Sequence, residues 1–252
     1  MLFLFPASLL AQTTSTVSGT SSTVVFSKPS TADAYTSAHP GAKLARAASG
    51  KLTFLNPDRT LTMMSGGGVS YQQNGLWAPS KLQVAALNDG SGWRLSGVPM
   101  NVSLTGGQGQ AKDLSLNSGS VTMNFHLPQL SYNGDDTFTF QENGTTWLLR
   151  VAESSISIQA TVATRKGSAT HSLGYNSFGS ALSVDAKGSL HICGAVHVSP
   201  PHIVGADKKA YGVCSGWSQA GAGVAFTCDD TKLPAAAFPY VIDPTFTTGP
   251  TS

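Results

Sequence analysis

Charged residues are scarce in this sequence of 252 amino acids, at 11% of the chain, against about 25% in a typical soluble domain. Long surface helices depend on Glu, Lys and Arg, so the scarcity argues against a helical protein. The 15 basic and 13 acidic residues give a net charge of +2. The densest basic sites are only the dipeptides Lys208-Lys209 and Arg165-Lys166. Nucleic-acid binding requires several phosphate contacts on one face, so we expect no nucleic-acid partner.

Apolar runs long enough to cross a bilayer are also missing, and we expect no membrane span in the mature chain. A short apolar run, Leu2 to Leu10, precedes the small residue Ala11. This run is similar to the hydrophobic region of a secretory signal peptide, although no Lys or Arg precedes it. We therefore predict a signal peptide over residues 1–11 and a protein that is secreted or at the cell surface, whether extracellular or periplasmic. A buried first strand is the alternative interpretation of this run.

Cysteine is rare, with only Cys193, Cys214 and Cys228 in the chain. An exported protein can oxidise two of them, and the odd count then leaves one free thiol. Cys214 and Cys228 close the shorter loop and are the favoured pair. Three reduced and mostly buried cysteines are the alternative, because spacing alone does not fix pairing.

Glycine, serine and threonine are abundant instead, with 27 glycines alone. Residues 13–23 are nearly all Ser or Thr, and few large apolar residues follow up to Ser49. Such a segment buries too little apolar surface to order itself, so we predict a flexible tether over residues 12–50. Within it, residues 24–26 are typical of one short strand, and residues 43–48 look locally helical.

From Lys51 onward, apolar and polar residues alternate along short segments separated by turn sequences. Residues 52–54 and 61–63 alternate in this way around the turn Asn56-Pro57-Asp58. A period of two predicts an all-β fold, an antiparallel β-sandwich or stacked twisted sheets, with one main domain over residues 51–245. A division into two halves near residues 165–180 stays open. Residues 246–252 are predicted to be a linker. The longest alternation comprises Val121, Met123, Phe125 and Leu127.

Two local patterns carry a resemblance to a known family. In the first, a strand with Val69 and Tyr71 turns at Gly75 and re-enters with Trp77. The second, here called the module-closing motif, is formed by Pro239, Tyr240, Val241, Ile242, Asp243 and Pro244.

Together these patterns resemble the N-terminal β-rich modules of wall-associated and YD-repeat (Rhs-like) secreted bacterial proteins, although proline precedes tyrosine here where the family usually has the reverse order. The resemblance covers residues 51–245. It implies a structural or presentation role ahead of a repeat region, and it supplies no catalytic residues.

The module-closing motif also has a physical interpretation. Ile242 is expected to point into the core. Asp243 is held extended by the following proline and can bond a turn amide. Because Pro244 has no N–H to donate, we expect strand pairing to stop there.

Candidate metal ligands gather in the C-terminal third of the chain. His191 and Cys193 would share one face of a strand, and His197 and His202 follow nearby. No compact second pair of ligands follows at zinc-finger spacing, so we predict no metal and no other cofactor.

The carboxylate pairs Asp135-Asp136 and Asp229-Asp230 are candidates for calcium binding or glycoside hydrolysis. Each pair lies beside turn residues, and adjacent strand residues face opposite ways, so neither forms a dyad by itself. The chain also lacks a Gly-x-Ser-x-Gly motif. We therefore predict that the protein is not an enzyme.

The four tryptophans lie in strand-like runs, where packing is the ordinary role of such a side chain. Trp77, with Tyr71 nearby, is the best candidate for stacking on a sugar. We predict a non-catalytic, adhesin-like structural or presentation module of an exported bacterial protein. Its expected partners are downstream repeat domains of the same polypeptide or cell-surface glycans. The alternatives are a carbohydrate-binding module that uses exposed aromatics and, third, a β-sandwich glycoside hydrolase.

Overall fold

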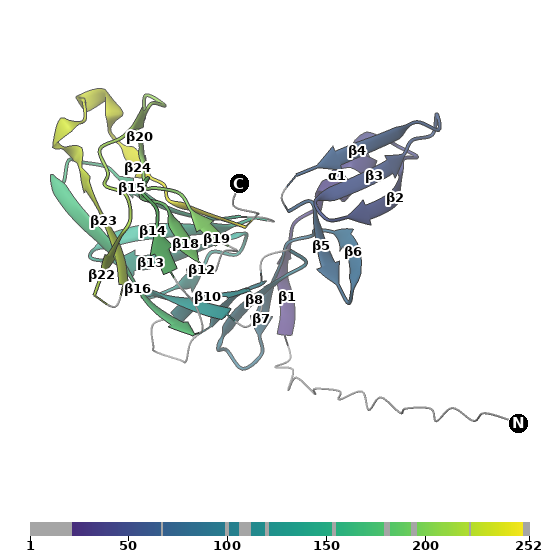
Figure 1. Ribbon diagram of the computed structural model, residues 1–252, viewed down its shortest axis with the longest axis horizontal. Helices are drawn as coiled ribbons and strands as arrows, with labels where there is room; N and C mark the ends of the chain where they lie inside the picture. The colour runs from purple at the N-terminus through teal and green to yellow at the C-terminus, as the bar shows by residue number, and fades with distance from the viewer. Residues whose placement is uncertain are drawn as a thin grey trace, which may run out of the picture.

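The computed structural model describes residues 22–66, 68–98, 101–105, 112–118, 121–152, 155–178, 182–192, 196–221 and 223–248. These residues form strands almost throughout, and the sheets are antiparallel, so the predicted all-β, sandwich-like fold is confirmed. Figure 1 shows two large sheets on one side of the molecule and a small group of elements standing out from them. Within the described part of the chain, no helix has the length and apolar character needed to cross a membrane.

The first large sheet has nine strands and contains the first strand of the described chain. Its neighbours are often consecutive in sequence, as hairpin connections produce. The spatial order is β1 (Ser22–Ser27), β7 (Gln83–Leu87), β8 (Gly92–Ser96), β9 (Asn101–Thr105), β10 (Lys112–Ser118), β11 (Val121–Leu127), β16 (Ser168–Phe178), β23 (Gly223–Asp229) and β22 (Ser218–Ala220).

The second large sheet has 11 strands, some of them very short. Three of these lie off its main path: β24 (Tyr240–Ile242) pairs with β15 and with β20 (Ile203–Val204), which pairs with β21 (Ala210–Tyr211). The 3-10 turns η1 (Asp230–Lys232) and η2 (Ala235–Ala237) lead into β24. The main path runs β12 (Ser131–Tyr132), β13 (Thr137–Glu142), β14 (Thr145–Val151), β15 (Ser155–Val162), β25 (Thr245–Thr248), β19 (Val196–Val198), β18 (Leu190–Ile192) and β17 (Leu182–Val184).

The core of this sandwich is built from alternate residues of its strands. In β15, for example, Ile156, Ile158 and Ala160 are at most 1% exposed, whereas the residues between them reach the surface more. Strands of period two place such residues on one face, which packs against the other sheet. Many of the residues that the sequence pattern selects lie in this core, among them Phe125, Leu127, Phe138, Phe140, Trp147, Leu149, Val151 and Val162.

A smaller unit, here called the N-terminal unit, spans residues 30–80 and has its own core. Ala32, Leu52 and Phe54 are buried together, and the ring of Tyr35 lies 4.4 Å from that of Phe54 between centroids. The unit stands apart from the sandwich in Figure 1. It consists of α1 (Thr31–Ala38), the sheet β2 (Lys43–Ala48), β3 (Lys51–Leu55) and β4 (Leu61–Ser65), and the hairpin β5 (Ser70–Gln73) and β6 (Leu76–Pro79).

The predicted tether over residues 12–50 is therefore wrong from Ser22 onward; residues 12–21 lie outside the described part. The strand expected at residues 24–26 is present within β1, but residues 43–48 form strand β2 rather than a helix. The segment does have few large apolar residues of its own. It is ordered because α1 and β2 pack on Leu52 and Phe54, which belong to the strand after it.

The single domain predicted over residues 51–245 is also wrong at its start, because residues 51–80 belong to the N-terminal unit with its separate core. The division near residues 165–180, which was left open, does not occur, because β16 runs through this region and pairs with both β11 and β23. The linker expected at residues 246–252 begins as β25, which pairs with β15 and β19. Pairing does pause at Pro244, but it resumes at Thr245, because a proline removes one donor and does not turn the chain away from the sheet.

Candidate functional site

The outer face of the β17–β18–β19 meander brings together three side chains that can bind a metal ion: Asp185, His191 and His197. His191 and His197 are directly opposite each other in the register of β18 and β19. Both point outward, because the residues on either side of them in each strand are buried: Leu190, Ile192, Val196 and Val198. Directly opposite residues of an antiparallel pair lie close together on the same face of the sheet.

Asp185 begins the turn that joins β17 to β18. Its Oδ1 accepts hydrogen bonds from the amides of Lys187 (2.8 Å) and Ser189 (2.9 Å), which fixes the carboxylate within the turn. Its Oδ2 lies 3.0 Å from His191 Nε2. The hydrogen bond with His191, followed by the amide bonds, holds the pKa of Asp185 well below its usual value. One ligand atom from each of Asp185, His191 and His197 lies within 4.8 Å of the others.

The histidines of this group were among the metal ligands considered from the sequence, but the third member was not. His202 contributes a backbone carbonyl, which accepts the amide of Asp243 at 3.0 Å, and it is not part of the group. Cys193 lies outside the described residues. The spacing of the histidines did not reveal that the turn after β17 returns the Asp185 carboxylate to the face that carries both of them.

The two carboxylate pairs have separate structural roles. The Asp135 carboxylate accepts the Thr137 amide (2.7 Å) in a turn, whereas Asp136 forms ion pairs with Lys28 (3.7 Å) and Arg150 (4.0 Å). The Asp229 side chain caps η1. Asp230 is 0% exposed and anchors a network with the 165–167 loop and Tyr240.

A buried contact between imidazole and carboxylate joins His171 on β16 to Glu142 on β13, a pairing that was not predicted from the sequence. Glu142 Oε2 lies 3.2 Å from His171 Nδ1, and Oε1 accepts the amide of Ser172 at 3.2 Å. The two side chains are only 8% and 9% exposed, and the His171 ring packs against Trp147 and Phe226. The pair ties the two sheets together. His171 also borders a cleft of about 550 Å³ whose lining is rich in threonine hydroxyls: Thr145, Thr146, Thr161, Thr164 and Thr170.

The aromatic pair considered for sugar stacking lies on the β5–β6 hairpin. Tyr71 is opposite Ala78, and Trp77 is opposite Gln72. Because directly opposite residues share a face, the two rings lie on opposite faces of the hairpin and do not form one platform. Trp77 is 39% exposed, whereas Trp147 and Trp217 are core residues.

A disulfide joins Cys214 to Cys228, the pair that closes the shorter loop. It links the segment before β22 to β23. The module-closing motif forms β24, in which Tyr240 and Ile242 are buried and lie on the same face. Its Asp243 side chain accepts hydrogen bonds from Ser157 and Gln159 of the neighbouring strand β15, rather than from a turn amide as expected.

Reducing the Cys214–Cys228 disulfide should lower the free energy of unfolding by about 2 to 3 kcal/mol. The 14-residue separation means that the bond restricts a loop of the unfolded chain, and a loop of this length contributes on that order. Urea unfolding of the oxidised protein and of a Cys214→Ser/Cys228→Ser variant measures the difference. A change below about 0.5 kcal/mol would contradict the expectation.

Comparison of the chain with protein-family models, with curated proteins and with solved structures found no match.

Proposed function

We propose that the chain is a non-catalytic structural and presentation module of an exported protein, placed ahead of a repeat region of the YD-repeat type. The observation that carries the proposal is the N-terminal unit, which is held out from a large β-sandwich by two segments that run side by side. The family assignment itself rests on the motifs around Tyr71 and Tyr240.

The connection between the two parts, here called the junction, consists of residues 27–28 and 81–82. The Lys28 amide donates to the Leu82 carbonyl (3.0 Å), and the Lys81 amide donates to the Gly97 carbonyl (2.6 Å). The first bond joins the two segments of the junction, and the second joins the junction to the end of β8. Two chain segments that are bonded to each other resist bending more than a single linker does. The junction is therefore suited to holding the N-terminal unit in one orientation.

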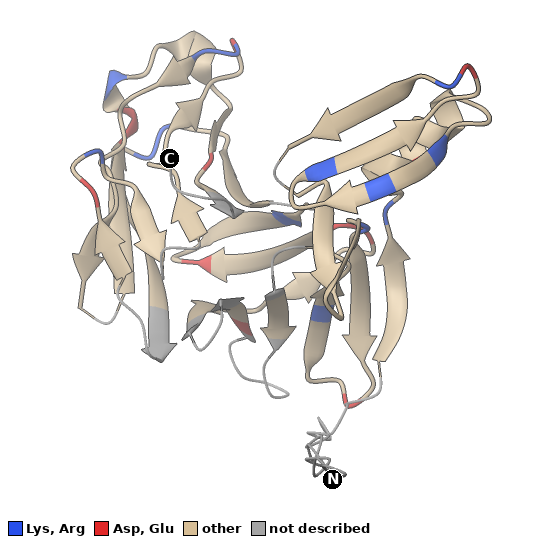
Figure 2. Cartoon of the chain, turned by 45° about the vertical axis from the view of Figure 1, so that its right-hand side comes forward, with Lys and Arg blue, Asp and Glu red and all other residues tan. Residues whose placement is uncertain are grey.

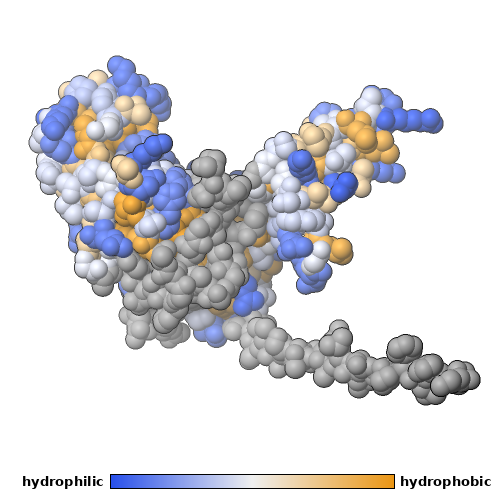
Figure 3. Space-filling model, viewed as in Figure 1, coloured by the Kyte–Doolittle hydropathy of each residue, from blue (hydrophilic) through white to orange (hydrophobic). Residues whose placement is uncertain are grey.

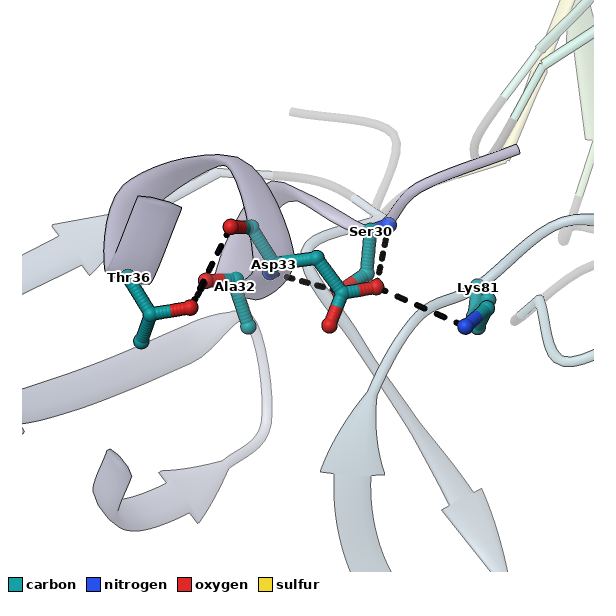
Figure 4. A network of polar contacts seen from close by, with 5 residues as sticks. All are labelled: Ser30, Ala32, Asp33, Thr36 and Lys81. Atoms are coloured by element: carbon teal, nitrogen blue, oxygen red, sulfur yellow. Dashed lines mark hydrogen bonds and ion pairs between the residues drawn. The ribbon is translucent and has the colours of Figure 1, made fainter. Parts of the chain in front are cut away.

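A polar network continues from the junction into helix α1 (Figure 4). Ser30 and Asp33 form a capping box, in which each side chain accepts the backbone amide of the other at 3.0 Å. The ammonium group of Lys81 lies 3.6 Å from the Asp33 carboxylate. An exposed ion pair of this kind contributes at most about 1 kcal/mol, so its main effect is to orient the helix on the junction.

The surface that is presented is the outer face of β2–β3–β4. In the register of these strands, Leu55 of β3 lies opposite Lys43 of β2 on one side and Leu61 of β4 on the other. In the same way, Thr53 lies between Arg46 and Met63. Leu55, Leu61 and Met63 are 42%, 67% and 64% exposed. Apolar residues at the surface of the N-terminal unit appear in Figure 3, and its Lys and Arg residues in Figure 2. Exposed apolar groups next to cations are a common feature of binding surfaces.

Export is supported by the Cys214–Cys228 disulfide, because such bonds persist in oxidising compartments. The apolar run from Leu2 to Leu10 supports the same localisation.

The proposal predicts a fixed orientation of the N-terminal unit. Spin labels at Ser65→Cys and Ala163→Cys, in a Cys193→Ser background, should give a narrow distance distribution by pulsed electron paramagnetic resonance. Gly97→Ala should broaden it, because a Cβ at Gly97 would lie 2.1 Å from the Lys81 carbonyl oxygen, at a φ of +72°.

The matched control is Gly75→Ala on the β5–β6 hairpin, where φ is +80° and no atom lies within 4 Å of the added Cβ. It should leave the distribution narrow. A broad distribution in the unsubstituted chain would refute the presentation role. Retention of the chain on a polysaccharide matrix that is lost with Trp77→Ala would favour the carbohydrate-binding alternative instead.

A further inference from the structure

The β17–β18–β19 meander concentrates metal-binding chemistry on one small area of the sandwich surface. Asp185, His191 and His197 belong to a stretch of only 13 residues, and each is neither fully buried nor fully exposed. Their ligand atoms are therefore accessible to an ion from solvent. Strand alternation, the pairing of β18 with β19 and the turn at Asp185 determine this arrangement.

We propose that Asp185, His191 and His197 bind one divalent transition-metal ion, for which Zn²⁺ is the best match. Two imidazoles and one carboxylate are a ligand set suited to Zn²⁺ and to its first-row neighbours. Ca²⁺ and Mg²⁺ prefer sites made of oxygen ligands, and two of the three ligands here are nitrogen.

The distances are compatible with this assignment. Bonds of about 2.0 to 2.1 Å in tetrahedral geometry place neighbouring ligand atoms about 3.4 Å apart. The Asp185 and His191 atoms already lie 3.0 Å apart, and all three ligand atoms lie within 4.8 Å of one another. Rotation of these partly exposed side chains about their χ angles is enough to bring the ligand atom of His197 to bonding distance of the same ion. The ion would then keep one position open to water.

Asp185 is held in place for this role. The amides of Lys187 and Ser189 occupy its Oδ1, and Oδ2 remains directed at the histidines. Hydrogen bonds that orient a metal ligand in this way typically strengthen metal binding about 10- to 100-fold. The turn thus prepares the carboxylate before any ion arrives.

A second His–carboxylate pair on the surface provides a matched control. His126 and Asp113 are also opposite each other on neighbouring strands, with Nδ1 and Oδ1 2.6 Å apart. No third ligand of the described residues joins them in a metal-binding group. A substitution of His126 therefore removes a hydrogen bond between histidine and carboxylate without removing a proposed metal ligand.

The experiment is equilibrium dialysis of the untagged, full chain against micromolar Zn²⁺, with the bound metal counted by atomic spectroscopy. One equivalent should bind and should raise the melting temperature, because the folded state alone assembles the site. His191→Ala, His197→Ala and Asp185→Asn should each weaken binding at least about 100-fold, since they remove ligands rather than orienting groups. His126→Ala and His202→Ala should leave it unchanged.

Circular dichroism and the melting temperature without zinc show whether each variant is folded. Asp185→Asn keeps an oxygen for the turn amides, so it tests ligation with the turn intact. The proposal is overturned if the chain binds no zinc under these conditions, or if the three ligand variants bind it as well as the unsubstituted chain. Loss of binding in Cys193→Ser would overturn the assignment too, because the thiol would then be a ligand.

Discussion

Replacing Asp230 by alanine should lower the free energy of unfolding by about 3 to 5 kcal/mol. The carboxylate is 0% exposed and accepts the amides of Lys166 (2.7 Å) and Gly167 (2.8 Å) and the hydroxyl of Tyr240 (2.9 Å). Alanine would leave the buried Tyr240 hydroxyl and two part-buried amides without their acceptor, and a buried, unsatisfied donor costs roughly 1 to 3 kcal/mol. Burial, and then the hydrogen bond to Asp230, raise the pKa of Tyr240 far above the working range, so its hydroxyl stays protonated as a donor.

Chemical denaturation of Asp230→Ala, Asp230→Asn and Asp229→Ala measures this effect. The asparagine variant keeps one acceptor and should lose less stability than the alanine variant. Asp229 is only a cap on η1, and its loss should cost about 1 kcal/mol. Equal losses for Asp229→Ala and Asp230→Ala would show that the buried network is not the cause. The network matters because it fixes the start of the module-closing strand β24.

Gly188→Ala should also destabilise strongly, by about 3 to 5 kcal/mol. Gly188 has a φ of +79°, and a Cβ there would lie 2.4 Å from the Cα of Gly216. The left-handed conformation costs a residue with a side chain roughly 1 to 2 kcal/mol. Overlap with a backbone atom adds about 1 to 3 kcal/mol or more, because no side chain can rotate away to relieve it. The contact is held by the Trp217 amide, which donates to the Gly188 carbonyl at 2.9 Å.

Gly144→Ala separates the conformational cost of a positive φ from the cost of steric overlap. Gly144 has a φ of +72° in a hairpin turn, and no atom lies within 4 Å of an added Cβ. This variant should lose only about 1 to 2 kcal/mol, which is the conformational cost alone. If urea unfolding gives the same loss for both variants, the close approach of Gly188 and Gly216 does not limit stability.

Alternation of apolar and polar residues predicted the sandwich because strand faces depend on neighbours in the sequence. Phe125 and Leu127 were selected in this way and are 0% exposed. The turns could be predicted for the same reason. Glycine and the short side chains of Asn and Asp favour turn conformations wherever they occur.

The N-terminal unit could not be predicted by this reasoning. Residues 31–38 contain only one large apolar side chain, Tyr35, and alone they would not form a stable helix. The helix exists because Tyr35 and Ala32 pack on Phe54, and because Ser30 and Asp33 cap it. Neither this cap nor the surface on which the helix packs was predicted from the sequence.

The candidate metal site was only half visible. The sequence predicted a shared strand face for His191 and Cys193, whereas His197 and His202 were only nearby candidates. The third ligand is Asp185, because the register of β18 against β17 and β19 fixes which residues are adjacent. Register depends on pairing across the sheet, which the spacing of histidines does not specify.

The sequence by itself determined that this chain forms short antiparallel strands joined by tight turns, and which face of most strands is buried. These properties follow from side-chain alternation and local turn conformations over a few residues. Only the tertiary structure decided that the strand after Pro244 rejoins the sheet, that residues 30–80 have a core of their own, and that Asp230 is an internal anchor. Each of these depends on contacts between segments far apart in the chain, such as the 64 residues between Lys166 and Asp230. Local pattern carries no information on which distant strand becomes the neighbour, because that choice is made by the packing of the whole core.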